Sequence, residues 1–115
     1  MIHYIPMTFE EYQERSRKTA LYPKVGASFV YPTLGLAGET GEVAEKVQKI
    51  FRDDGGKVTA NKKEEIKKEL GDVLWYLSQV ATEFGLSFDT IAKTNLDKLR
   101  SRVKRGRLQG SGDNR

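Results

Sequence analysis

Two pairs of acidic residues, each with a spacing of three, are the part of this sequence best suited to chemistry. Glu39 and Glu42 form the first pair, and Glu69 and Asp72 follow at an offset of 30 residues. Residues three apart share one face of a helix, so each pair can present two carboxylates together. The surrounding residues match as well, which suggests an internal repeat of Glu39-Thr40-Gly41-Glu42-Val43 in Glu69-Leu70-Gly71-Asp72-Val73. Helical patterning alone can produce such a similarity, but it does not easily explain matched glycines and matched acids together.

Both acid pairs border an apolar stripe. At roughly 100° per residue, the first stripe consists of Leu36, Val43, Val47 and Ile50, and the second of Ile66, Leu70, Val73, Leu77, Val80 and Phe84. The acids lie on the same side of each stripe. If the two helices pack antiparallel through these stripes, four carboxylates converge, and like charges at close range raise one another's pKa. A divalent cation relieves this repulsion, so the sequence predicts a metal site with Glu39, Glu42, Glu69 and Asp72 as ligands.

The available ligand types restrict the metal. The chain contains no cysteine, and its one histidine, His3, lies near the N-terminus. Ligation by oxygen alone favours Mg²⁺, with Mn²⁺ as a possible substitute. A di-iron bundle uses Glu-x-x-His pairs, for which this sequence has no histidine.

Four glycines lie inside expected helices, where each costs about 1 kcal/mol relative to alanine. Gly41 and Gly71 fall within the acidic motifs, and for them we favour close approach of a ligand. For Gly35 and Gly38, tight packing of helices is nearly as good an explanation.

Helix-capping and helix-breaking residues predict four helices, over residues 8–20, 33–52, 61–84 and 87–105, and no strand. Thr8 with Glu11, and Asn61 with Glu64, are helix-start signals. Gly85 suits a C-terminal cap and Ser87 the next start. The prediction is an all-α, four-helix bundle-like domain over residues 1–105, followed by a glycine-rich basic tail over residues 106–115. A chain of 115 residues buries a limited core, so we expect the bundle to be completed by oligomerisation.

Positive charge is concentrated at the C-terminal end. The net charge is +4, and the segment from Lys98 onward holds seven basic residues against one acidic residue. These cations suit a helix end, a phosphate-bearing ligand or nucleic acid. No apolar run approaches the roughly 20 residues that cross a bilayer, and the first residues do not resemble a signal peptide. We therefore expect a cytoplasmic protein.

Several basic and polar side chains are placed where they could bind phosphate groups. Asn95, Lys98 and Arg102 form one row along the last expected helix and border its apolar stripe, so they are predicted to reach inward. Lys46 continues the acidic row of the second helix and could do similar work. Salt bridging of Lys46 with Glu42, four residues earlier, is the stronger explanation for that lysine.

The motifs as a group resemble the MazG-like family of all-α nucleoside-triphosphate pyrophosphohydrolases. The signature of that family is Glu-x-x-Glu, a spacer, and Glu-x-x-Asp, which here is Glu39 to Glu42, residues 43–68, and Glu69 to Asp72. The resemblance extends from about residue 9 to the end, through Gly35-Leu36-Ala37-Gly38, Val73-Leu74-Trp75-Tyr76, Asn95-Leu96-Asp97-Lys98-Leu99 and Gly110-Ser111-Gly112-Asp113-Asn114-Arg115.

The resemblance implies hydrolysis of a (deoxy)nucleoside triphosphate to the monophosphate and pyrophosphate. It assigns Mg²⁺ to the four motif acids, points independently to Asn95 and Lys98, and implies a homodimer or homotetramer. Trp75, Tyr76 and Tyr12 could stack on the nucleobase, although core or interface positions suit them better. Gln13 and Thr19 are further candidates for the base pocket.

The expected reaction is attack of water on the α-phosphorus. Glu39 is the first candidate for the base that removes the proton of this water, and Glu45 is the second. The main alternative is a nonenzymatic helical module that binds nucleic acid or a partner through its basic C-terminal segment. We consider nucleic-acid binding unlikely, because it leaves the equivalent positions of the two acid pairs unexplained.

Overall fold

A computed structural model describes residues 6–106 and 112–113 of the chain. Its helices are α1 (Phe9–Arg17), α2 (Val30–Asp53), α3 (Ala60–Glu83) and α4 (Phe88–Lys104). There is no strand among these residues, so the all-α prediction is confirmed. None of the helices in the described ranges combines the length and apolar character that a membrane crossing requires.

Hydroxyl side chains fix three of the helix starts. Thr8 forms the predicted capping box, because its Oγ1 accepts from Glu11 N at 3.0 Å and Thr8 N donates to Glu11 Oε1 at 3.3 Å. Ser87 caps α4 as predicted. The prediction of Asn61 as the start of α3 was wrong: Thr59 is in the extended conformation that a cap needs, and its hydroxyl accepts from Lys62 N at 3.2 Å.

Two other boundaries differ from those expected. Helix α1 ends at Arg17, three residues before the expected Ala20. Helix α2 begins at Val30, three residues before the expected Thr33. Pro32 therefore lies in the first turn of α2, where its missing N–H group leaves no hydrogen bond unmade.

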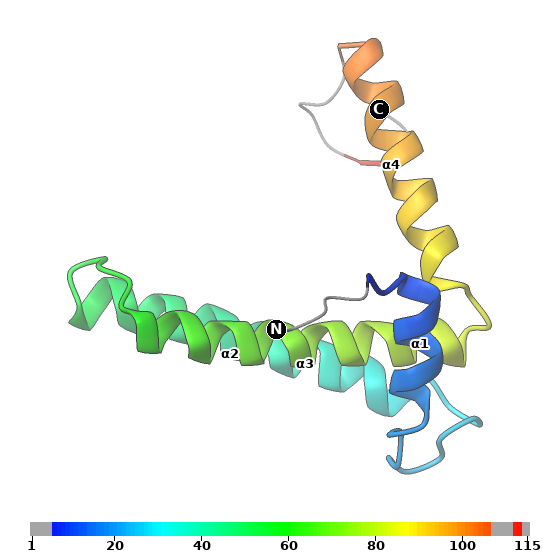
Figure 1. Ribbon diagram of the computed structural model, residues 1–115, viewed down its shortest axis with the longest axis horizontal. Coiled ribbons are helices and arrows are strands. Elements are labelled where there is room, and N and C mark those ends of the chain that lie inside the picture. Colours follow the sequence, from blue (N-terminus) through cyan, green and yellow to red (C-terminus); the bar gives the residue numbers. More distant parts are fainter. Residues whose placement is uncertain (1–5, 107–111, 114–115) are drawn as a thin grey trace.

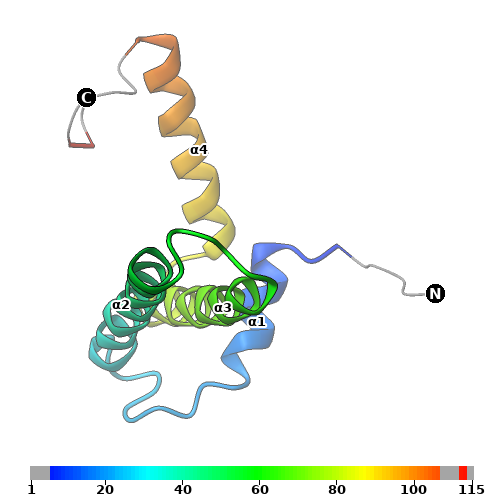
Figure 2. The same ribbon diagram turned by 90° about the vertical axis from the view of Figure 1, so that its left-hand side faces the viewer.

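Helices α2 and α3 form a long antiparallel pair, and α1 crosses α3 near the end from which α4 departs (Figures 1 and 2). Helix α4 projects away from this pair. The turn between α3 and α4 is closed by Gly85, with φ +69°, and by a bond of 2.8 Å from Leu86 N to Ala81 O. The ring of Phe88 then stacks on Phe9 of α1 at 4.7 Å. The first turn of α4 thus packs on α1, and α4 does not lie along α2 and α3 within one chain.

This arrangement leaves much apolar surface uncovered. The radius of gyration is 17.2 Å, against about 13 Å for a compact chain of this length. Val47, Leu70 and Phe84 belong to the stripes that we expected to be buried, yet each is about half exposed. Two helices can cover only part of each other's apolar face, and α4 projects away from this pair instead of lying over the remainder (Figure 1).

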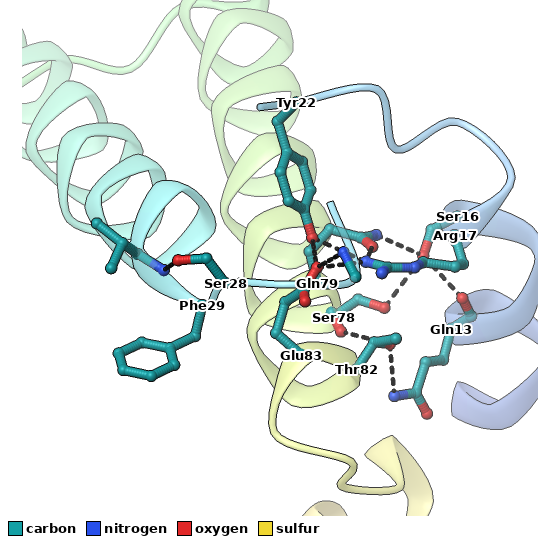
Figure 3. A network of polar contacts seen from close by, with 12 residues as sticks. Gln13, Ser16, Arg17, Tyr22, Ser28, Phe29, Ser78, Gln79, Thr82 and Glu83 are labelled. Atoms are coloured by element: carbon teal, nitrogen blue, oxygen red, sulfur yellow. Dashed lines mark hydrogen bonds and ion pairs between the residues drawn. The ribbon is translucent and has the colours of Figure 1, made fainter. Parts of the chain in front are cut away.

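A network of polar side chains joins α1 to α3 (Figure 3). The hydroxyls of Ser16 and Ser78 lie 3.0 Å apart, and Gln79 Nε2 donates to Ser16 Oγ at 3.0 Å. Nearby, the carboxylate of Glu83 accepts from Arg17 Nη1 at 3.0 Å, from Gly26 N at 3.0 Å and from the hydroxyl of Tyr22. These bonds fasten α1 and the following loop to the C-terminal half of α3.

Candidate active site

Three of the four predicted acids come together between α2 and α3. Glu39 lies on α2, whereas Glu69 and Asp72 lie on α3, and one carboxylate oxygen of each is within 4.8 Å of the other two. Glu39 and Glu69 are half-buried, and Asp72 is exposed. We call these three residues the acid trio. Its members converge because the antiparallel pairing of the helices aligns the two motifs, as the sequence predicted.

Glu42 does not belong to the trio. Its carboxylate is not among the oxygens that lie within 4.8 Å of one another, although Glu42 leaves α2 about 60° from Glu39, as Asp72 leaves α3 from Glu69. It is exposed to solvent. The resemblance remains the reason to regard Glu42 as a fourth ligand.

The trio is electrostatically strained without a cation. Burial raises the pKa of Glu39 most strongly, followed by its hydrogen bond to Glu69 and the charges of Asp72, Glu69 and Glu42. A hydrogen bond between two carboxyl groups requires a shared proton, which a divalent ion can replace. The donor set consists of hard oxygens close enough to share one ion, and it therefore fits Mg²⁺ or Mn²⁺.

Lys46 is the predicted cation that reaches the trio. Its Nζ lies 4.0 Å from Glu69 Oε1, so this lysine pairs across to α3. The alternative that we favoured for Lys46, a bond along α2 to Glu42, is not the pairing observed. The neighbouring Lys49 does follow that pattern, with Nζ 3.0 Å from Glu45 Oε1. Glu45 is exposed, and its pKa is lowered by the hydrogen bond and the charge of Lys49.

Asn95, Lys98 and Arg102 are not brought to the trio within one chain, because α4 points away from α2 and α3 (Figure 1). Their role in binding substrate stays a prediction, and within a single copy they lie on a helix that is separate from the trio. Asn95 and Lys98 instead line a groove of about 370 Å³ together with Ile91, Thr94, Leu86, Ser87 and Thr90. Arg102 is buried, with an exposed fraction of 3%, and donates to Asp113 O at 2.8 Å.

Two tyrosines flank the trio. Burial raises the pKa of Tyr76, and the nearby Tyr31, Glu39 and Asp72 raise it further. Burial and then the charge of Asp72 raise the pKa of Tyr12. Both phenol groups are therefore close to the acids and stay protonated at neutral pH.

Trp75 has a different environment. Its Nε1 donates to Thr19 Oγ1 at 2.8 Å, and its ring meets that of Tyr76 edge-on at 5.1 Å. Trp75 and Thr19 line a cavity of about 340 Å³ that also contacts Tyr12, Met7, Arg15 and Ser16. Gln13 lies elsewhere: it donates to Thr82 and Leu86 and accepts from Phe88 N, so it holds α1 to the turn before α4.

Only one of the four helical glycines is in tight contact with the described chain. A Cβ on Gly35 would lie 2.3 Å from the Tyr76 ring, which confirms helix packing as its role. Apart from the adjacent residues and the nearby backbone of the same helix, no described atom lies within 4 Å of a Cβ built on Gly38, Gly41 or Gly71. The open space beside Gly41 and Gly71 leaves room for a ligand or a second chain.

Replacement of Gly35 by alanine should lower the free energy of unfolding by about 1–3 kcal/mol, because the added methyl group overpacks the contact between α2 and Tyr76. Urea unfolding followed by circular dichroism measures this change. Gly38→Ala is the matched control, since its methyl group meets open space and alanine is the better helix former. An equal loss in both variants would contradict the assigned role of Gly35.

Sequence reasoning missed the polar network around Glu83. The available signal was the interruption of the α3 stripe by consecutive polar residues, Ser78 with Gln79 and Thr82 with Glu83. Their partners on α1 are more than 60 residues away, for example 62 residues from Ser16 to Ser78. Periodicity within one helix does not identify such partners.

Comparison with known proteins identifies the family of the chain. The profile of the MazG nucleotide pyrophosphohydrolase domain matches residues 32–106, which include most of α2 and all of α3 and α4. The chain is also 44% identical over 114 residues to the Gene 37 protein of Mycobacterium phage L5, covering 95% of this chain and 100% of that protein. No solved structure gives a significant match. On the strength of this profile and of the paired acidic motifs within it, the chain belongs to the family of MazG nucleotide pyrophosphohydrolases.

Proposed function

We propose that the protein is a Mg²⁺-dependent pyrophosphohydrolase that converts a (deoxy)nucleoside triphosphate into the monophosphate and pyrophosphate. The observation that carries this proposal is the convergence of Glu39, Glu69 and Asp72 within 4.8 Å on two antiparallel helices. Membership of the MazG family supports a nucleotide substrate. In the proposal the acid trio holds the metal, and Glu42 supplies a fourth carboxylate.

The bound Mg²⁺ supplies positive charge that offsets both the carboxylates and the triphosphate. The residues of the chain do the rest. Glu39 accepts the proton of the attacking water, whose oxygen forms a bond to the α-phosphorus as the bond to the departing pyrophosphate breaks. Glu39 is preferred to Glu45 because Glu45 is exposed and paired with Lys49. Lys46, next to Glu69, can turn toward the phosphates.

We also propose that the working enzyme is a homodimer or homotetramer. The accessible surface of one copy is 8919 Å², whereas a compact protein of 13.0 kDa exposes roughly 6,300 Å². The difference is of the size that obligate subunit interfaces bury. Apolar side chains are available to cover it, since Leu34 is 68% exposed and Phe51 is 80% exposed.

Assembly would also bring the predicted phosphate-binding residues close to the acid trio. Asn95 and Lys98 lie on α4, and α4 projects away from α2 and α3, which carry the trio (Figure 1). A second copy that packs on the exposed faces of α2 and α3 can bring its own α4 close to the trio. In this proposal Asn95 and Lys98 bind phosphate or sugar groups, while Tyr12, Tyr76 and Trp75 offer aromatic surfaces to the base.

The proposal is tested by identifying the products. Purified protein with Mg²⁺ should convert at least one canonical or damaged nucleoside triphosphate into monophosphate and pyrophosphate in equal amounts. In water labelled with ¹⁸O, attack on the α-phosphorus places the label in the monophosphate, and mass spectrometry detects it there. Release of single phosphate, or label in pyrophosphate, would contradict the mechanism. Salt-sensitive nucleic-acid binding without any hydrolysis would favour the nonenzymatic alternative.

A further inference from the structure

Residues beyond α4 lie against α4 itself. The carboxylate Oδ1 of Asp113 accepts from Lys98 Nζ at 2.9 Å, although 15 residues separate them in sequence. Arg102 Nη2 donates to the main-chain oxygen of Asp113 at 2.8 Å, to its Oδ1 at 3.3 Å and to Gly112 O at 3.4 Å. The described residues 112–113 (red in Figure 1) are therefore fastened to α4 at two of its side chains.

Arg102 is the fixed partner in this contact. Its side chain is 3% exposed, whereas that of Asp113 is 81% exposed. A buried guanidinium needs hydrogen-bond acceptors to offset the loss of water. Residues 112 and 113 provide them for Nη2, whereas Nε is buried without a partner among the described residues. Since the shortest of these bonds is to a main-chain oxygen, it does not depend on the side chain of Asp113. Arg102 thus anchors residues 112 and 113 to α4.

The carboxylate of Asp113 links this anchor to Lys98. The same oxygen, Oδ1, contacts both cations, and the hydrogen bonds from Lys98 and then from Arg102 lower the pKa of Asp113. An exposed ion pair alone would fix little. Here the guanidinium of Arg102 is buried, so its bonds hold the carboxylate of Asp113 in one position. Lys98 is thereby held in the lining of the groove that also contains Asn95.

We propose that Asp113 is a positioning residue, which is anchored by Arg102 and orients the ammonium group of Lys98 beside Asn95 for binding of substrate phosphate. This inference rests on the role of Lys98 in the proposed function. An ammonium group has three donors, and the bond to Asp113 uses one of them. The other two stay available for a phosphate, so the contact orients Lys98 without blocking it.

A double-mutant cycle on the assembled full-length protein tests the inference. Asp113→Ala should raise KM about tenfold, as loss of a group that orients a ligand-binding side chain does, with kcat changed less than about twofold. Asp113→Asn keeps an oxygen acceptor for Lys98 and should restore most of the affinity. Lys98→Ala should also raise KM, and Asp113→Ala should add nothing in the Lys98→Ala background, because Asp113 acts through Lys98.

Asp97→Ala is the matched control, since Asp97 is a carboxylate on α4 that pairs at 2.8 Å with the exposed Lys93. It should leave KM unchanged. Two results would overturn the inference: additive effects of Asp113→Ala and Lys98→Ala, or a lower KM in Asp113→Ala. The second would mean that the carboxylate competes with the substrate phosphates.

Two measurements keep this test separate from the test of the proposed function. Binding of inorganic pyrophosphate, followed by calorimetry across the same cycle, requires no turnover. Acetic anhydride labelling, quantified by mass spectrometry, reports directly on the Lys98 amine, which should react faster in Asp113→Ala while Lys93 is unchanged. If wild-type protein hydrolyses no nucleotide, the proposed function fails. If Lys98 is labelled equally in both proteins, the positioning role of Asp113 fails.

Discussion

Asp72→Asn should release pyrophosphate at least ~100-fold more slowly than the wild-type protein, because removal of a metal ligand costs more than the ~10–100-fold typical of the groups that support such ligands. The substitution keeps the shape of the side chain and removes one of three carboxyl groups whose oxygens lie within 4.8 Å of one another. The metal-free variant should also be more stable than metal-free wild type, because a like charge is removed from the acid trio. Initial rates at saturating nucleotide and Mg²⁺ measure the first effect, and thermal unfolding in a chelator measures the second.

The control for this variant is Glu64→Gln, which removes an exposed carboxylate from the same helix. Glu64 pairs at 3.7 Å with Lys67, and its side chain is 64% exposed. Its loss should leave both the rate and the Mg²⁺-dependent rise in melting temperature unchanged. If Asp72→Asn retained the wild-type response to Mg²⁺, the trio would not be the metal site.

Glu83→Ala should lower the free energy of unfolding by about 3 kcal/mol, which is the lower end of the cost of removing one partner from a buried ion pair. The side chain of Glu83 is 2% exposed and that of Arg17 is 27% exposed. Without this carboxylate, Arg17, Tyr22 and Gly26 all lose their shared acceptor. Denaturant unfolding at a fixed protein concentration measures the loss. Glu83→Gln keeps an oxygen acceptor and should lower the free energy of unfolding by less than Glu83→Ala. Equal stability of Glu83→Ala and wild type would contradict the structural role of Glu83.

The contribution of Glu83 should also depend on pH. Burial raises the pKa of Glu83, but the hydrogen bonds from Tyr22, Gly26 and Arg17 outweigh burial and hold the pKa below its usual value. The folded protein therefore binds this proton less readily than the unfolded chain, whose glutamates have a pKa of about 4.3. The stabilisation is complete above that value and is lost as the pH falls through the lower pKa of the folded state. The difference in stability between wild type and Glu83→Gln should accordingly narrow below about pH 4.

Local patterns predicted the helices and most of the acid site. The spacing of Glu39, Glu69 and Asp72 relative to apolar residues fixed the faces on which they lie, and antiparallel pairing of neighbouring helices is the expected outcome of a short connection. The position of Glu42 outside the trio depends on the separation of the helices, which periodicity does not give. Thr59 and Asn61 are both good capping residues, so the sequence alone does not decide between them. The conformation of the turn before α3 makes Thr59 the cap.

The direction of α4 was beyond sequence reasoning. It depends on the turn at Gly85 and on the packing of Phe88 against α1. One partner of Phe88 is Phe9, which is 79 positions earlier in the sequence. Lys98 and Arg102 border the apolar stripe of α4, but an apolar stripe in a sequence does not indicate which other surface will cover it. Arg102 found its acceptors in residues 112–113, which composition alone had assigned to a glycine-rich tail.

The hydroxyl and amide contacts between α1 and α3 have a consequence for the site. Apolar surfaces attract without regard to direction, so a helix held by them alone can slide by part of a turn. Hydrogen bonds weaken steeply when distance or angle changes, and the bond between Ser16 and Ser78 is fully buried. Helix α1 is therefore locked in a single register on α3. Since Tyr12 lies one turn before Ser16, this register also fixes the phenol that borders Asp72.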